Sequence, residues 1–156
     1  ANTEEILNAF IVKNNALNQS FLVVASDGRG FVVKAEDTLA QTKLGKQVLS
    51  PAEGAVAKFC LSVIGDYVAV VGQNRKLLIF PVSELPTMTK GRGVTLQKYK
   101  DGGIGDIKLF TLAEGLQWTR AGKIVNLTDL RAWQGKRAAS GRLAPISFPR
   151  SNVFEG

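Results

Sequence analysis

Histidine is absent from the 156 residues of this chain, and cysteine occurs once, as Cys60. Without histidine there is no Ser-His-Asp or Cys-His catalysis and no histidine metal ligand or general base. One cysteine permits neither an internal disulfide nor a zinc finger, and no GxxxxGK[ST] phosphate loop is present. These absences argue against an enzyme, so we expect no catalytic residue, no metal and no cofactor in this chain.

Long hydrophobic runs are also missing. No apolar stretch approaches the length of a membrane span, and no signal peptide is visible. The cysteine content is typical of a reducing compartment, so we expect a cytoplasmic protein without a membrane partner. Because the chain starts at Ala1 and not at methionine, we also expect it to be a fragment of a longer protein.

Acidic residues are scarce in one part of the chain. Residues 1–66 hold six Lys and Arg against seven Asp and Glu, a balance of −1, whereas residues 67–156 hold fourteen against six, a balance of +8. Such a basic portion indicates a polyanionic partner, either nucleic acid or an anionic membrane. The alternative is a solvated surface of mixed charge.

What the chain has in quantity is glycine, 16 residues, spread among short runs of Val, Ile and Leu. Apolar runs on either side of a Gly, Asn or Asp tip are typical of β-hairpins. Three such patterns occur, at 21–33, 67–80 and 116–125. A further strand is expected at Ile6–Val12, and one helical turn is compatible with Leu127–Trp133. The fold class that these patterns predict is all-β.

The three hairpins belong to a repeat of about 46 residues. A shift of 46 places Phe31 on Leu77 and Lys46 on Arg92, and a basic glycine loop and a return strand follow each of the first two hairpins. We predict one domain of three units, at 21–66, 67–114 and 115–150. Units of this length with about four strands match propeller-like blades, here three in an open or partial ring.

Residues outside this pattern have simpler interpretations. We expect Cys60 and the two tryptophans, Trp118 and Trp133, to pack in the core. The segment Gly102–Asp106 is interpreted as a turn between blades, and the carboxylates of Asp101 and Asp106 are weak evidence for a metal. The tail Ser147–Gly156 has no counterpart in the repeat, and it is expected to be either a cap or a frayed end.

The remaining candidate site is a set of cations that recurs in the loops and hairpin tips of each repeat. Equivalent loops of neighbouring blades would form one basic belt, which would contact phosphates without reading sequence. Few aromatic residues accompany these cations, so duplex DNA fits better than single strands. The candidate DNA-binding residues are Lys43, Lys46, Arg75, Lys76, Lys90, Arg92, Lys98, Lys100, Arg120, Lys123, Lys136, Arg137 and Arg142.

The stretch GDYVAVVGQNRKLLIFPVSELPTMTKGRGVTLQKYKDGGIGDIKLF at 65–110 resembles the C-terminal domain of type IIA topoisomerase A subunits. The ending GRLAPISFPRSN at 141–152 is similar to the bacterial topoisomerase IV members of this family in particular. This resemblance implies a β-pinwheel, in which neighbouring blades exchange strands. It also implies a rim that binds and bends duplex DNA and steers it to a cleavage core outside this chain.

The same resemblance implies partners and a location. The partners are the remainder of the topoisomerase polypeptide and, through it, the ATPase subunit, in the bacterial cytoplasm at the nucleoid. The loops 41–47 and 87–93 resemble degenerate versions of the glycine- and arginine-rich box of gyrase. That favours topoisomerase IV, which decatenates and relaxes DNA. The alternatives are a propeller-like protein-interaction module that uses residues 21–64 and the equivalent domain of the DNA gyrase A protein.

Overall fold

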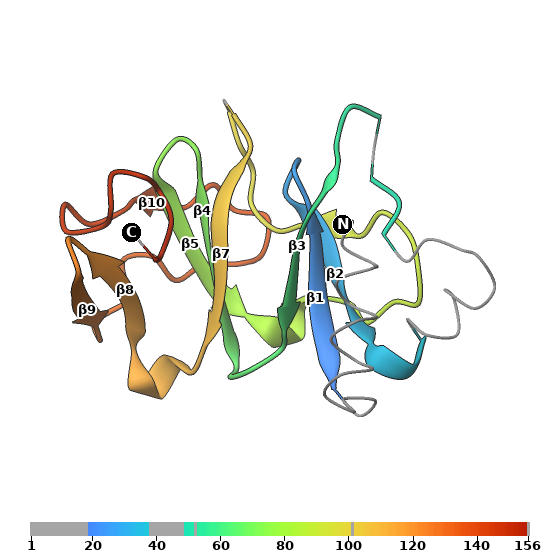
Figure 1. Ribbon diagram of the computed structural model, residues 1–156, viewed down its shortest axis with the longest axis horizontal. Helices are drawn as coiled ribbons and strands as arrows, with labels where there is room; N and C mark the ends of the chain where they lie inside the picture. Colours follow the sequence, from blue (N-terminus) through green and yellow to red (C-terminus); the bar gives the residue numbers. More distant parts are fainter. Residues whose placement is uncertain (1–18, 38–48, 52, 101, 156) are drawn as a thin grey trace. The chain divides into compact units, whose positions relative to one another are not determined.

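The structure is a computed structural model that describes residues 19–37, 49–51, 53–100 and 102–155. The chain forms two compact units (Figure 1). Unit 1 comprises Ala1–Val63 with Leu85–Thr95, and unit 2 comprises Ile64–Glu84 with Leu96–Gly156. The strand predicted at Ile6–Val12 lies outside the described residues.

Unit 1 contains one four-stranded sheet in the order β3-β1-β2-β6. The pairings between these four strands are antiparallel, and β1 and β2 form the first predicted hairpin. Both faces of these two central strands are buried, which suits their continuous runs of Val, Leu and Phe. The strands are β1 (Ser20–Ala25), β2 (Arg29–Lys34), β3 (Ala57–Ser62) and β6 (Val94–Thr95).

Unit 2 contains a four-stranded sheet in the order β10-β5-β4-β7 and a two-stranded sheet, β8-β9. The second and third predicted hairpins are confirmed as β4-β5 and β8-β9. The strands are β4 (Tyr67–Gly72), β5 (Lys76–Pro81), β7 (Ile104–Phe110), β8 (Leu116–Arg120), β9 (Lys123–Leu127) and β10 (Arg142–Leu143). Two short 3-10 helices, η1 (Val82–Glu84) and η2 (Leu112–Glu114), complete the unit.

The all-β fold class and its propeller-like sheets are therefore confirmed, and the repeat boundaries stay a prediction. None of the helical segments in the described part of the chain has the length and hydropathy needed to span a membrane.

The fourth strand of each larger sheet comes from a later part of the chain. In unit 1, Gly30 pairs with Val94, and in unit 2, Leu77 pairs with Arg142. A glycine with positive φ precedes each donated strand, Gly93 (φ 84) and Gly141 (φ 80). Each glycine lies on the backbone of the receiving strand, where a Cβ atom would overlap a carbonyl oxygen. This donation is the strand exchange that the resemblance implies.

The register of the two sheets corrects the predicted repeat shift by one residue. Val24 pairs with Gly30 and Val71 pairs with Leu77, and in both sheets a β-bulge follows the first residue of that pair. The structural counterpart of Leu77 is therefore Gly30, a shift of 47 between the hairpins, and not Phe31. A slip of one residue moves every side chain to the opposite face of a strand.

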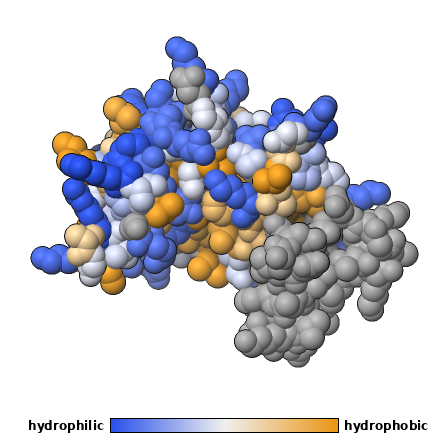
Figure 2. All heavy atoms as spheres, turned by 45° about the horizontal axis from the view of Figure 1, so that its top comes forward, coloured by the Kyte–Doolittle hydropathy of each residue, from blue (hydrophilic) through white to orange (hydrophobic). Residues whose placement is uncertain are grey.

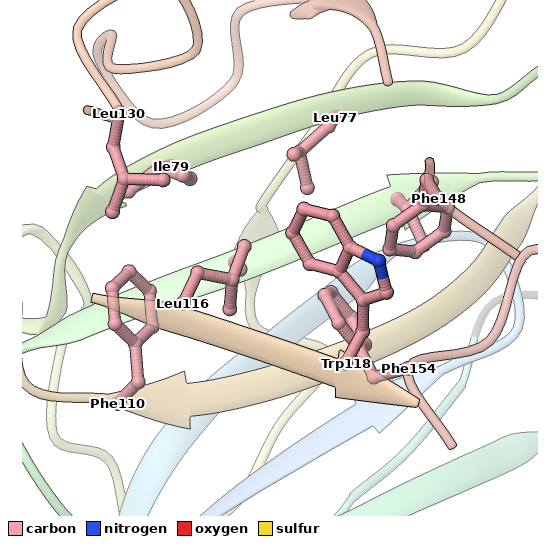
Figure 3. Close-up of a cluster of buried hydrophobic side chains, with 10 residues drawn as sticks. Leu77, Ile79, Phe110, Leu116, Trp118, Leu130, Phe148 and Phe154 are labelled. Atoms are coloured by element: carbon pink, nitrogen blue, oxygen red, sulfur yellow. The ribbon is translucent and has the colours of Figure 1, made fainter. Parts of the chain in front are cut away.

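The tail packs into the main core of unit 2, so the alternative of a frayed end is wrong. Phe148 and Phe154 are 0% and 2% exposed. The rings of Trp118 and Phe148 pack edge to face with their centroids 5.4 Å apart. The rings of Phe148 and Phe154 do the same at 5.3 Å between centroids (Figure 3). Such edge-to-face pairs add about 1 kcal/mol each to the burial of the rings. The tail is therefore a cap.

Three smaller expectations have mixed outcomes. β7 starts at Ile104, so the segment Gly102–Asp106 is only partly a turn. β9 extends to Leu127, and a single turn follows in which Trp133 and Gln134 both donate to Leu130 O, at 3.0 and 3.2 Å. Cys60 is half-buried and packs against the core of unit 1.

Strand exchange makes a testable prediction at Gly141. An alanine Cβ there would lie 2.5 Å from Leu77 O, in addition to the strain of a positive φ. Gly122 has a similar φ of +77, but its Cβ would meet nothing within 4 Å. We expect Gly122→Ala to lower the free energy of unfolding by about 1 kcal/mol and Gly141→Ala by about 3 kcal/mol. Urea unfolding of both variants measures the difference, and equal losses would contradict a close contact between β10 and β5.

Candidate nucleic-acid interface

The loop that leads into β10 is held in place by Gln97, a side chain that is 1% exposed. Its Nε2 donates to Lys76 O at 2.9 Å and to Ser140 O at 3.0 Å. The backbone adds two further bonds, from Ala138 N to Leu96 O at 2.8 Å and from Lys98 N to Ala139 O at 3.1 Å. These contacts fix residues 136–143 beside residues 96–98 and the start of β5.

Four predicted cations lie on or next to this anchored loop. We call the surface that they form the Gln97 surface. Lys98, Lys136 and Arg142 are exposed, and Lys76 is half-buried at the start of β5. None of the four side chains forms an ion pair with another described residue. Lys100 is exposed two residues beyond Lys98. Cations free of acidic partners on a fixed backbone are suited to bind an anion.

Arg137 lies in the same loop, but its polar groups contact η1. Its backbone N donates to Glu84 Oε1 at 2.8 Å, and its Nε donates to Glu84 O at 3.1 Å. The carboxylate of Glu84 offsets part of the positive charge at this point. Arg137 therefore helps to fix the loop, and we do not count it among the four cations of the Gln97 surface.

Arg75 holds the C-terminal cap. Its Nη1 donates to Pro149 O at 2.7 Å and to Asn152 Oδ1 at 3.0 Å, and its Nη2 donates to Phe148 O at 3.2 Å. The guanidinium also lies 5.9 Å from the centre of the Phe148 ring. Arg75 has a φ of +66, a conformation that strains any residue other than glycine. Such strain persists where surrounding contacts impose it, and here the cap supplies those contacts.

The remaining predicted residues of unit 2 lie at the β8-β9 hairpin. Arg120 is exposed and donates from Nη1 to Ile146 O at 3.1 Å, and Lys123 is exposed at the start of β9. Arg150, which was not among the predicted residues, is exposed and near Arg120. The repeat pattern could not indicate Arg150, because this residue lies in the tail, which has no counterpart in the repeat.

In unit 1 the predicted residues Lys90 and Arg92 are exposed on either side of Gly91. The backbone there is anchored, because Ser50 N donates to Gly91 O at 2.8 Å and Gly93 packs on Gly30. Lys43 and Lys46 lie outside the described residues.

Other chemistry has little support among the described residues. They contain no group of three Cys, Asp or Glu side chains that could hold a metal. Burial raises the pKa of the Cys60 thiol to about 11, which keeps it protonated and unreactive at neutral pH. Trp118 is 2% exposed and donates from Nε1 to Ser147 O at 3.1 Å, so its predicted role in the core is confirmed. Trp133 is half-buried against the same cluster.

The clamp made by Arg75 can be tested by separating its charge, its hydrogen bonds and its strain. We expect Arg75→Ala to lower the free energy of unfolding by about 3 kcal/mol, since it removes charged hydrogen bonds to the cap. Arg75→Gly should lose up to about 1 kcal/mol less, because glycine adopts the same φ without strain. Arg75→Lys keeps the charge and should still be destabilised, because an ammonium cannot replace the planar fork. Urea unfolding measures the stability of each variant. Wild-type stability in all three would contradict the proposed role of Arg75 in holding the C-terminal cap.

Comparison with known proteins shows which proteins this chain resembles. The family described as DNA gyrase C-terminal domain, beta-propeller, matches residues 66–105. The A subunit of DNA topoisomerase 4 from Rickettsia conorii is 42% identical over 150 residues, which cover 96% of this chain and 20% of that protein. Its counterpart from Caulobacter vibrioides is 40% identical over 134 residues, which cover 85% of this chain and 18% of that protein. The chain thus spans about a fifth of the length of these relatives.

Solved structures show the same fold. The E. coli ParC C-terminal domain has a TM-score of 0.70 at 22% identity, with 83% of this chain and 57% of that chain covered. A DNA gyrase A C-terminal domain has a TM-score of 0.63 at 16% identity, with 83% and 48% covered. The predicted resemblance is therefore confirmed: over most of its length this chain is related to the A subunits of DNA topoisomerase 4, and it has the fold of the C-terminal domains of type IIA topoisomerase A subunits.

Proposed function

We propose that this chain is a duplex-DNA-binding domain of the topoisomerase IV A subunit, which binds and bends DNA on its basic loops. The observation that carries this proposal is the Gln97 surface, where four cations that form no ion pair with another described residue lie on or beside a hydrogen-bonded loop. Sequence similarity to topoisomerase 4 subunits across 96% of the chain supports it. In the whole enzyme such a domain steers DNA segments to the cleavage core for decatenation and relaxation.

The physical basis is contact with phosphates. Lys and Arg side chains that neutralise phosphates release condensed counterions, so binding depends on salt and little on sequence. A fixed loop limits the conformational entropy that its cations lose on binding. In unit 1, the exposed Lys90 and Arg92 are proposed as phosphate contacts in their own right. Lys43 and Lys46 remain candidates from the sequence alone.

The domain is proposed to be non-catalytic by itself. Its partners are duplex DNA, the remainder of the topoisomerase polypeptide and, through it, the ATPase subunit. Its proposed location is the bacterial cytoplasm at the nucleoid. The equivalent domain of gyrase A is the second candidate, favoured by the family match at 66–105. The two candidates differ in whether the domain wraps DNA, which a topoisomer assay with added domain and a relaxing enzyme would reveal.

A salt series tests DNA binding directly. We expect binding to any duplex of sufficient length at low salt, with affinity that falls steeply and linearly on a log–log plot against salt concentration. Each phosphate contact contributes about 0.9 to the slope. Fluorescence anisotropy with two unrelated duplexes gives the slope and the sequence dependence. Affinity indifferent to salt, or no binding at low salt, would overturn the proposal, and recovery of a protein partner instead would favour the interaction module.

Charge reversals locate the interface. We expect Lys90→Glu, Arg92→Glu and Arg142→Glu each to weaken binding severalfold on every duplex and to lower the salt slope by about 1. Arg131→Glu is the matched control, because it changes the net charge equally. Arg131 is engaged by Asp129 in an exposed ion pair of 3.0 Å, and this hydrogen bond lowers the pKa of Asp129. Equal effects of all four variants would mean that only net charge matters.

A further inference from the structure

Ile146 is the most exposed large hydrophobic residue among those described, at 94%. It lies between β10 and the buried Phe148, in the sequence Ala144-Pro145-Ile146-Ser147. Figure 2 shows hydrophobic residues interspersed with hydrophilic ones on the visible face. A single exposed isoleucine is ordinary on a protein surface, so it is the setting of Ile146, and not its exposure alone, that points to a role.

The backbone that carries Ile146 is fixed on both sides. Two indoles donate to it, Trp133 Nε1 to Leu143 O at 2.9 Å and Trp118 Nε1 to Ser147 O at 3.1 Å. Arg120 donates to the carbonyl of Ile146 itself. Further bonds are Ala144 N to Arg75 O at 2.8 Å and Phe148 N to Pro145 O at 2.9 Å. The side chain of Ile146 thus projects from a backbone that hydrogen bonds hold in place.

The surroundings of Ile146 are strongly basic. A hollow of about 440 Å³ is lined by Ile146, Leu143 and Ala144 together with three arginines, Arg75, Arg120 and Arg150. Arg75 is committed to the cap, whereas Arg150 makes no ion pair with another described residue. A second hollow shares Arg120 and Arg150 and also includes Glu155, the one carboxylate that lines either hollow. An apolar side chain between cations is suited to a ligand that carries negative charges and apolar surface together, as the phosphates and stacked bases of DNA do.

We propose that Ile146 is a wedge that inserts between two base pairs of duplex DNA, while Arg120 and Arg150 contact the flanking phosphates. This inference rests on the proposed function and specifies how the DNA is bent. Isoleucine is one of the side chains that unstack base steps from the minor groove and kink the duplex. Unstacking costs free energy, which burial of the isoleucine and the two phosphate contacts offset. Flexible pyrimidine–purine steps should accept the wedge most readily.

The test uses the 156-residue chain and a duplex with repeated TA steps, in which 2-aminopurine replaces adenine at several of them. Unstacking raises the fluorescence of this base. We expect a rise on binding of the wild type and loss of most of that rise in Ile146→Ser. End-to-end energy transfer across the same duplex should show a smaller bend for Ile146→Ser. Affinity should change by less than about tenfold, because the cost of unstacking disappears together with the contact.

Two matched variants keep the test specific. Ile124→Ser removes an isoleucine of the same unit that is 73% exposed on β9, and it should retain the full rise and the full bend. Ile146→Phe should also retain both, since phenylalanine is an alternative wedge. Neither Ile146 variant should change thermal stability, because the side chain touches little of the fold.

The outcomes separate the two proposals. Binding of the wild type without a rise in fluorescence, or a rise undiminished in Ile146→Ser, would overturn the wedge and leave DNA binding intact. Absence of all binding at low salt would overturn both proposals.

Discussion

The architecture depends on a backbone contact between each receiving strand and the strand donated to it. The sheet of each unit is completed only when a glycine with positive φ lies against a carbonyl of the receiving strand, at Gly93 in unit 1 and Gly141 in unit 2. The residues just before each glycine form the basic loop. The element that closes the sheet and the element that carries the cations are therefore the same stretch of chain, so the fold itself determines where the charge lies.

Gln97 shows how the coupling works in unit 2. Its amide nitrogen satisfies carbonyls from β5 and from the basic loop at once, while its buried Oε1 has no hydrogen-bond partner among the described residues. A buried acceptor without a donor costs about 1–3 kcal/mol. The fold tolerates that cost at a position where one side chain links the sheet to the loop. Placement of the loop cations is thus tied to the stability of the core.

The sequence predicted the three hairpins because glycine tips between apolar runs report local structure. It did not fix their register, since both faces of β1, β2, β4 and β5 are buried and no polar alternation marks one face. The role of Arg75 was also hidden. Its partners lie in the tail, far along the chain, and a cation in a hairpin tip looks alike whether it meets a phosphate or a carbonyl.

Arg75 therefore changes how the charge of this chain is counted. In the first hairpin the equivalent tip residue is Gly28, which adopts φ 84 without strain, whereas Arg75 holds φ 66 and spends its guanidinium on the cap. Arg137 is similarly engaged with Glu84. A count of Lys and Arg overstates the proposed interface, because some cations are structural. What distinguishes the four cations of the Gln97 surface is that they lie on or beside anchored backbone and form no ion pair with another described residue. This property, more than net charge, is what a phosphate-binding surface requires.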